Sequence, residues 1–177
     1  MKRLDIVHTS THHKFHISTK LNDIEILGLI NNIRKYRYVP LKYLEKHNNL
    51  NDYKIILPKS NGTGAFGETL STPLIGNPLV GYTQSFISIG SFKTNNEAES
   101  CLKYIKTKFV RSMLGVLKVT QDNNKDVWKY VPLQDFSDNS KIDWTKSISE
   151  IDQQLYAKYN LSPDEIDFIT KMIKPME

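Results

Sequence analysis

Asp52 and Lys54, in the first third of the chain, have the acid-x-Lys spacing that Mg²⁺-dependent nucleases place on a strand. Such a site also requires an upstream acidic residue to complete the metal ligands. No upstream Pro-Asp pair supplies it here, and a three-residue match occurs by chance in most chains. A Mg²⁺-dependent endonuclease acting through Asp52 and Lys54 is therefore kept as an alternative prediction.

Methyl transfer to adenine needs a glycine-rich cofactor loop and an Asn-Pro-Pro-aromatic turn. Asn77-Pro78-Leu79 lacks both the second proline and the stacking aromatic residue. The glycine-rich stretch 62–67 follows Pro58 and does not open a helix. The sequence contains no Walker loop and no Ser or Cys nucleophile with a credible His base. We therefore predict no catalytic residues and expect no catalytic activity from this chain alone.

Four of the five histidines lie within the first sixteen residues. His12 and His16 have i, i+4 spacing, but no Cys or carboxylate joins them, and the surrounding Thr and Ser residues favour an extended or looped chain. Imidazoles on the surface, or in contact with bases, fit this setting better than metal ligands. We predict no metal site and no cofactor for this chain.

Two polar loops carry side chains suited to reading bases. The first, 59–81, contains five of the eight glycines, which allow its backbone to approach a ligand closely. The second follows residue 117. Asn and Gln can offer adenine a donor and an acceptor together, and Lys suits guanine or phosphate. The same residue types are common in ordinary turns and flexible connectors, so both interpretations stay open. The base-reading candidates are Lys59, Asn61, Thr63, Thr83, Gln84, Lys118, Gln121 and Asn123.

The charge is unevenly distributed along the chain. Residues 1–130 hold 19 Lys and Arg against 10 Asp and Glu, whereas residues 131–177 hold 5 against 9. A basic body followed by an acidic tail favours a polyanionic partner for the body, because each phosphate neutralised by Lys or Arg releases counterions. Compositional bias in a Lys-rich organism would give the same imbalance. The phosphate-contact candidates are Lys35, Arg37, Lys108 and Arg111.

Hydrophobic periodicity predicts the elements that carry these residues. The apolar residues of 95–117 recur every three or four positions, and Thr94 with Glu97 has capping-box spacing, so one long helix is expected there. In this helix Tyr104, Thr107, Lys108 and Arg111 should face away from the apolar side. A buried strand is expected within 81–92, another at 53–57, and a closing strand at 126–133. A helix over 22–34 and a short strand ending at Pro40 are expected nearer the N-terminus.

The C-terminal tail has two further helix starts, Ser147 with Glu150 and Ser162 with Glu165. They predict helices over 147–159 and 163–174. The fold class is therefore α+β: a mixed or mostly antiparallel sheet with one long packed helix and two C-terminal helices. Residues 1–136 would form the main domain and 137–177 a helical tail packed on it. Cys101 is expected to be a small core residue.

Three runs of sequence, taken in order, resemble a known family. They are residues 52–78, residues 83–136 with the segment VPLQDF, and residues 142–169 with IDWTKSISEIDQQLYAKYNLSPDEIDFI. Together they resemble the C-terminal target-recognition region, the TaqI-like specificity domain, of type IIG-like restriction-modification proteins. In those proteins an endonuclease and an N6-adenine methyltransferase are linked to the specificity domain. The resemblance covers about residues 52–175, and the order of elements is also similar to the recognition domains of type I specificity subunits.

The resemblance implies a domain that lies against double-stranded DNA and reads its bases. Cleavage and methyl transfer would belong to associated endonuclease and methyltransferase domains, and S-adenosylmethionine and Mg²⁺ are expected only there. A cytoplasmic location is expected, with no membrane partner. A third possibility is a scaffold domain of the same system that does not bind DNA and holds its partners through the tail. DNA recognition requires the two polar loops to lie together, on a surface that is not negatively charged.

Overall fold

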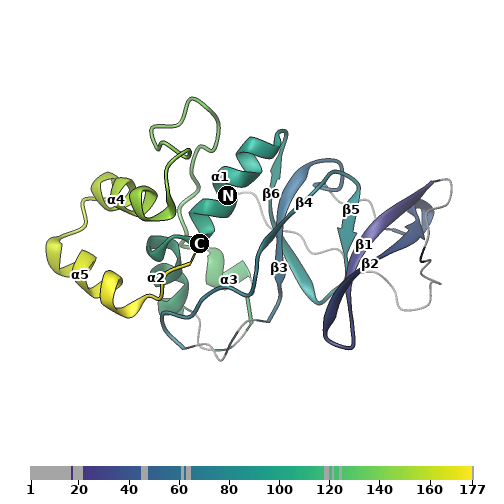
Figure 1. Ribbon diagram of the computed structural model, residues 1–177, viewed down its shortest axis with the longest axis horizontal. Coiled ribbons are helices and arrows are strands. Elements are labelled where there is room, and N and C mark those ends of the chain that lie inside the picture. Colours follow the sequence, from purple (N-terminus) through teal and green to yellow (C-terminus); the bar gives the residue numbers. More distant parts are fainter. Residues whose placement is uncertain are drawn as a thin grey trace.

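The computed structural model describes residues 22–44, 48–60, 65–117 and 125–176, together with the single positions 17, 62, 120, 122 and 123. Over these residues the fold is α+β, as predicted, with two three-stranded sheets and five α-helices. The molecule is elongated: one sheet occupies one end, the second sheet lies in the middle, and the helices gather at the other end (Figure 1). Among the described residues, no helix is long and apolar enough to cross a membrane.

The first sheet contains a β-hairpin where a helix was predicted. β1 (Asp23–Ile30) and β2 (Ile33–Pro40) are antiparallel, and β5 (Val80–Tyr82) pairs with β1 in parallel. Asn31 and Asn32 form the turn with φ of 52° and 60°, the left-handed pair that a two-residue hairpin turn requires. The predicted helix over 22–34 is therefore wrong. The apolar residues of this segment occupy both faces of β1, and their spacing also fits one face of a helix.

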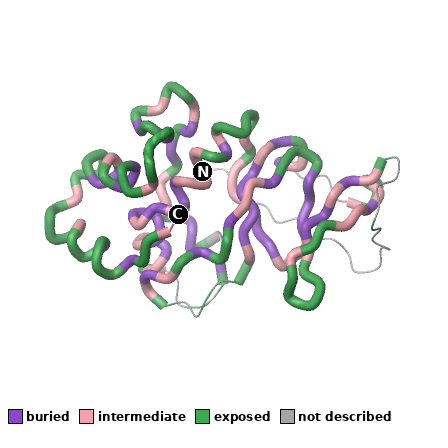
Figure 2. The backbone as a smooth tube through the Cα atoms, in the orientation of Figure 1, coloured by how far each residue is buried: buried purple, intermediate pink, exposed green. Residues whose placement is uncertain are grey.

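The second sheet is antiparallel and lies between the first sheet and the helices. β3 (Tyr53–Pro58) is its central strand, flanked by β4 (Leu74–Gly76) and β6 (Phe86–Phe92). Ile55 and Leu57 pack into the core shared with the helices, whereas Ile56 packs with residues of the first sheet such as Leu27. The prediction of a buried strand at 53–57 is confirmed. Figure 2 shows this buried central layer with the exposed segments around it.

The helix predicted over 95–117 is broken at Thr107 into α1 (Asn95–Lys106) and α2 (Lys108–Leu117). The predicted capping box of Thr94 and Glu97 is present. At the break, the Thr107 hydroxyl donates to the Tyr104 carbonyl oxygen at 2.6 Å and accepts from the Val110 amide at 3.2 Å. The Asp152 carboxylate completes the start of α2 by accepting the amides of Lys108 at 3.0 Å and Phe109 at 2.9 Å.

The break changes which side chains are buried. Tyr104, Thr107 and Arg111 were predicted to face away from the core, yet all three are buried. Val116, one of the apolar residues whose spacing predicted a buried face over 95–117, is exposed. Tyr104 is covered by the segment before α4 (Ile148–Lys158), where its ring packs against Phe136 and Trp144. α4 and α5 (Pro163–Met172) contact α2 on the side that a solvated helix would turn to water.

We expect Asp152→Ala to lower the free energy of unfolding by about 1–3 kcal/mol, because it leaves two amides at the start of α2 without an acceptor. Burial raises the pKa of Asp152, while its two amide donors act in the opposite direction. Urea denaturation of Asp152→Ala beside Asp138→Ala, which removes an exposed carboxylate, measures the effect. Equal stability of the two variants would show that Asp152 does not hold α2.

The C-terminal tail follows its local sequence signals closely. Both predicted capping boxes are present, at Ser147 with Glu150 and at Ser162 with Glu165, and Pro163 occupies the first turn of α5. The helices are slightly shorter than the predicted ranges. The closing strand predicted at 126–133 is wrong: α3 (Lys125–Trp128) begins there, and residues 129–136 follow without pairing in a sheet. Two smaller features are the 3₁₀ turn η1 (Leu41–Tyr43) and Cys101, which is buried as predicted.

Candidate nucleic-acid interface

The two polar loops predicted to read nucleobases contact each other where they connect to the rest of the fold. Ser60 and Asp122 form an antiparallel bridge, and the Asn123 amide donates to the Lys59 carbonyl oxygen at 2.6 Å. The two loops therefore meet at residues 59–60 and 122–123, and the DNA-recognition hypothesis requires that they lie together. Four of the base-reading candidates lie outside the described residues, namely Asn61, Thr63, Lys118 and Gln121.

Asn123 holds the two loops together and is not available for base contact as placed. Its side chain is 1% exposed, and its amide nitrogen donates to the Pro58 carbonyl oxygen at 3.1 Å. The prediction of Asn123 as a base-reading residue is corrected on this ground. An asparagine side chain can either contact a base or hold a loop in place. Because the Asn123 side chain is buried against the end of β3, it holds the loop in place.

A second junction brings Lys59 next to the turn between β5 and β6. The Lys59 amide donates to the Ser85 carbonyl oxygen at 2.9 Å, and the Thr83 amide donates to the Leu27 carbonyl oxygen at 2.9 Å. Lys59 and Gln84 are exposed, and Thr83 is half-buried. The turn at residues 83–85 therefore links the two sheets and places Gln84 beside the start of the first polar loop.

The hairpin adds cations to this surface. Lys35 lies directly opposite Gly28, so the two residues share one face of the hairpin. A methyl group at Gly28 would lie 3.2 Å from the Thr83 side chain, which places Thr83 over that face. Arg37 follows on the same face, half-buried, with its guanidinium donating to the Tyr36 carbonyl oxygen at 2.8 Å.

These residues share one edge of the molecule. The hairpin turn, the turn between β5 and β6 and the end of β3 all lie along the lower edge in Figure 1. We name this surface the loop edge and define it by Lys35, Lys59, Ser60, Thr83, Gln84 and Asp122. Both of its lysines are exposed, and Asp122 is an acidic residue among them.

Arg34 supports the loop edge and was not singled out by the sequence. Its guanidinium donates to the carbonyl oxygens of Thr72 at 2.6 Å and Ser71 at 3.0 Å, and it lies 5.7 Å from the centre of the Phe86 ring. These contacts fix the hairpin to the rest of the fold. A prediction of the Asn31-Asn32 turn from the sequence would have placed Arg34 near the start of a strand, two residues after that turn.

Two of the predicted phosphate contacts are tied to the helical half of the molecule. Arg111 is 2% exposed, and its guanidinium donates to the carbonyl oxygens of Lys106, Glu68 and Lys174. Three chain segments are thereby joined by one buried cation, and the prediction of Arg111 as a phosphate contact is corrected. Lys108 is half-buried and donates to the Thr170 carbonyl oxygen at 2.8 Å.

The residues of the alternative nuclease site have other partners. The Lys54 ammonium is buried, and burial lowers its pKa to about 8. It donates to the carbonyl oxygens of Asn49 at 3.1 Å, Leu50 at 3.4 Å, Asp52 at 3.0 Å and Asn77 at 3.1 Å. The Asp52 carboxylate accepts from Lys93 at 2.8 Å and from Ser91, and these bonds lower its pKa. Among the described residues, no three His, Cys, Asp or Glu side chains cluster as metal ligands.

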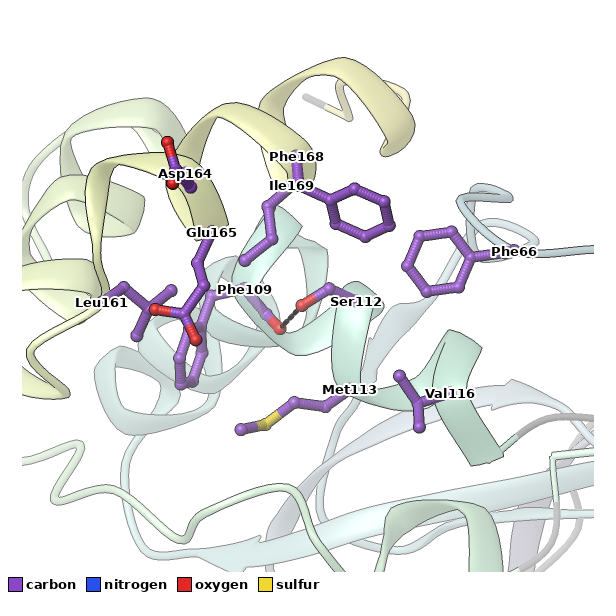
Figure 3. A pocket seen from close by; sticks show the side chains of 10 residues that line it. All are labelled: Phe66, Phe109, Ser112, Met113, Val116, Leu161, Asp164, Glu165, Phe168 and Ile169. Carbon is purple, nitrogen blue, oxygen red and sulfur yellow. Dashed lines mark hydrogen bonds between the residues drawn. The ribbon is translucent and has the colours of Figure 1, made fainter.

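A second surface lies in the helical half of the molecule, where a groove of about 480 Å³ runs between α2 and α5 (Figure 3). Its apolar lining includes Met113 and Ile169, and the rings of Phe66 and Phe168 lie 5.8 Å apart at one end. Val116 and Phe168 are exposed. Asp164 and Glu165 contribute carboxylates to the lining.

Comparison with known proteins gives no relative from which a function could be transferred: no family model, curated protein or solved structure matches this chain.

Proposed function

We propose that this chain is a sequence-specific DNA-binding domain that supplies target recognition to the methyltransferase and endonuclease domains of a restriction-modification system. The observation that carries the proposal is the joining of the two polar loops beside exposed lysines at the loop edge. The resemblance of residues 52–175 to target-recognition domains points in the same direction. A cytoplasmic location belongs to this proposal, because the DNA it would recognise is there.

The division of labour at the loop edge follows from side-chain chemistry. Lys35 and Arg37, on the strand face, would contact phosphates and fix the register of the duplex. Lys59 and Gln84 would reach base edges, with the loop residues 61, 63, 118 and 121. The Thr83 hydroxyl is buried, so the prediction of Thr83 as a base-reading residue is corrected as Asn123 was. Asp122 adds an acceptor that suits the cytosine amino group. In this scheme Asn123 and Arg34 position the loops and the hairpin without contacting DNA.

The salt dependence of binding tests the phosphate contacts. Fluorescence anisotropy with a duplex of random sequence should give an affinity that falls steeply as salt rises. Lys35→Gln should weaken binding uniformly across sequences and reduce the slope of log affinity against log salt by about one. Lys171→Gln, which removes an exposed lysine of α5, should leave the slope unchanged. Binding that does not respond to salt would contradict the proposal.

The groove between α2 and α5 favours a second candidate function, the scaffold. Its exposed aromatic and aliphatic side chains and its carboxylates, on a tail of negative charge, fit an amphipathic helix with basic flanking residues. In this second candidate function the helix would belong to an associated methyltransferase chain. In this scheme the tail holds the partner whether or not the loop edge binds DNA.

We expect Phe168→Ser to weaken co-purification of this chain with the methyltransferase chain of the same system by at least tenfold, since an exposed aromatic anchor is lost. Leu133→Ser changes an apolar residue elsewhere that is more exposed than Phe168, and it should have no effect. Retention of the methyltransferase by a protein that fails to bind DNA would favour the scaffold. If both variants, or neither, lose co-purification with the methyltransferase chain, the groove is not the binding site for that chain.

A further inference from the structure

The tip of the β1–β2 hairpin is apolar and exposed to solvent. Ile30 and Ile33 are the cross-strand pair next to the turn, and they are 39% and 59% exposed. Leu29 and Tyr36, further along the two strands, are also exposed, but the alternation of side chains places them on the opposite face of the hairpin. We name Ile30 and Ile33 the apolar tip. An exposed apolar pair held at a fixed position is a candidate contact surface, because water solvates apolar side chains poorly.

The apolar tip is held away from the core by a well-anchored hairpin. At the other end of the hairpin, Ile24, Ile26 and Val39 are buried together. Arg34 fastens the strand after the turn through its two carbonyl acceptors at residues 71 and 72. The Asn31-Asn32 turn fixes the direction of the two strands. The isoleucines are therefore presented at a defined place and cannot fold back into the core without breaking these contacts.

Cations follow the apolar tip on the strand that begins at Ile33. Lys35 and Arg37 lie on the same face as Ile33, whereas Arg34 lies on the opposite face and donates to the carbonyl oxygens of residues 71 and 72. Apolar side chains flanked by cations fit a partner with an anionic surface and an apolar interior, which describes a nucleic-acid duplex or an anionic membrane. The neighbouring loop edge favours the duplex, because an exposed amide such as Gln84 and joined polar loops match base edges and have no counterpart among acyl chains.

We propose that the apolar tip enters a groove of the bound duplex and inserts Ile33, supported by Ile30, between two base pairs, so that the stack opens and the DNA bends. Apolar wedges of this kind bend DNA by roughly 20–90°. The phosphates beside the opened step would then face Lys35 and Arg37. This inference rests on the proposed DNA-binding function and adds a deformation of the duplex to it, with sequence preference arising from steps that unstack easily.

The test measures bending separately from binding. A duplex that the protein has enriched from a random pool is labelled with fluorescent dyes at its two ends, and a second copy carries 2-aminopurine at successive positions. The wild-type chain should shorten the end-to-end distance and raise 2-aminopurine fluorescence at one step. The double variant Ile30→Ala/Ile33→Ala should bind about tenfold more weakly and, at saturation, leave the duplex straight and stacked.

Leu133→Ala, which truncates an aliphatic side chain that is 89% exposed, is the matched control and should bend the duplex as the wild type does. Circular dichroism of all three proteins checks that the hairpin variants are folded. A wild-type complex that is straight, or a double variant that still bends the duplex, would overturn the inference and leave the proposed function standing. A third outcome is that the wild-type chain binds phosphatidylserine vesicles and no duplex, and that the double variant does not bind the vesicles. That outcome would overturn both the inference and the proposed function.

Discussion

The double variant Lys35→Glu/Lys59→Glu is expected to bind duplex DNA about 100-fold more weakly than the wild type at low salt. Lys35 lies on the hairpin and Lys59 begins the first polar loop, so the two lysines belong to different segments that meet at the loop edge. The reversal at Lys35 removes a phosphate contact, the reversal at Lys59 removes a cationic contact to a base edge, and each adds a carboxylate that the duplex repels. The loss should shrink as salt rises, because counterion release drives the lost contacts.

Titration of labelled duplex at several salt concentrations measures this effect. Lys141→Glu/Lys146→Glu has the same change in net charge, at exposed positions before α4, and is the matched control. It should weaken binding several-fold at most, through the overall field of the protein. Equal losses in the two double variants would mean that binding responds to net charge alone, and the loop edge would lose its assignment.

The second large effect concerns stability. Lys54→Met is expected to lower the free energy of unfolding by about 3 kcal/mol, because it removes the buried cation that donates to the carbonyl oxygens of residues 49, 50, 52 and 77. The oxygens of residues 49, 50 and 77 keep one backbone amide donor each. Lys93→Met removes the exposed partner of Asp52 and should cost at most about 1 kcal/mol. Urea denaturation of both variants gives the comparison.

The pH dependence of this effect has a definite sign. Burial lowers the pKa of Lys54 from 10.5 to about 8, so between these values the unfolded chain binds more protons at this residue than the folded chain does. The contribution of Lys54 to stability therefore rises with pH over this window and is lowest below pH 8. The difference in unfolding free energy between wild type and Lys54→Met should grow from pH 8 to pH 10.

The same variant separates the structural role of Lys54 from the alternative nuclease. A catalytic Lys54 would give a Lys54→Met protein of nearly wild-type stability that has lost Mg²⁺-dependent cleavage. The contacts of the ammonium predict the reverse, a destabilised protein with no cleavage to lose. If Lys54→Met has normal stability but has lost Mg²⁺-dependent cleavage, the nuclease hypothesis is supported.

Elements governed by local chemistry were predictable from the sequence. The three capping boxes depend on residues three positions apart, and Thr94, Ser147 and Ser162 all cap helices. The 53–57 strand was also readable, because its apolar run is short and ends at Pro58. The helix over 22–34 failed because the residues of β1 are apolar on both faces, so helical and strand periods fit them equally well.

The remaining errors come from partners distant in sequence. The break at Thr107 depends on Asp152, 45 positions further along, and no local pattern announces it. The burial of Arg111 and Asn123 likewise depends on carbonyl acceptors in other segments. The prediction of DNA recognition requires the two polar loops to lie together. The sequence alone could not test this requirement, because the bridge from Ser60 to Asp122 is a tertiary contact.

Repeated selection of a randomised duplex pool by the purified chain tests the central claim most directly. If the loop edge reads bases, one sequence motif should be enriched reproducibly, and Gln84→Ala should relax the preference at one position of that motif while leaving most of the affinity. A pool that stays random through successive rounds, while the protein binds heparin as well as it binds duplex DNA, would contradict sequence-specific recognition.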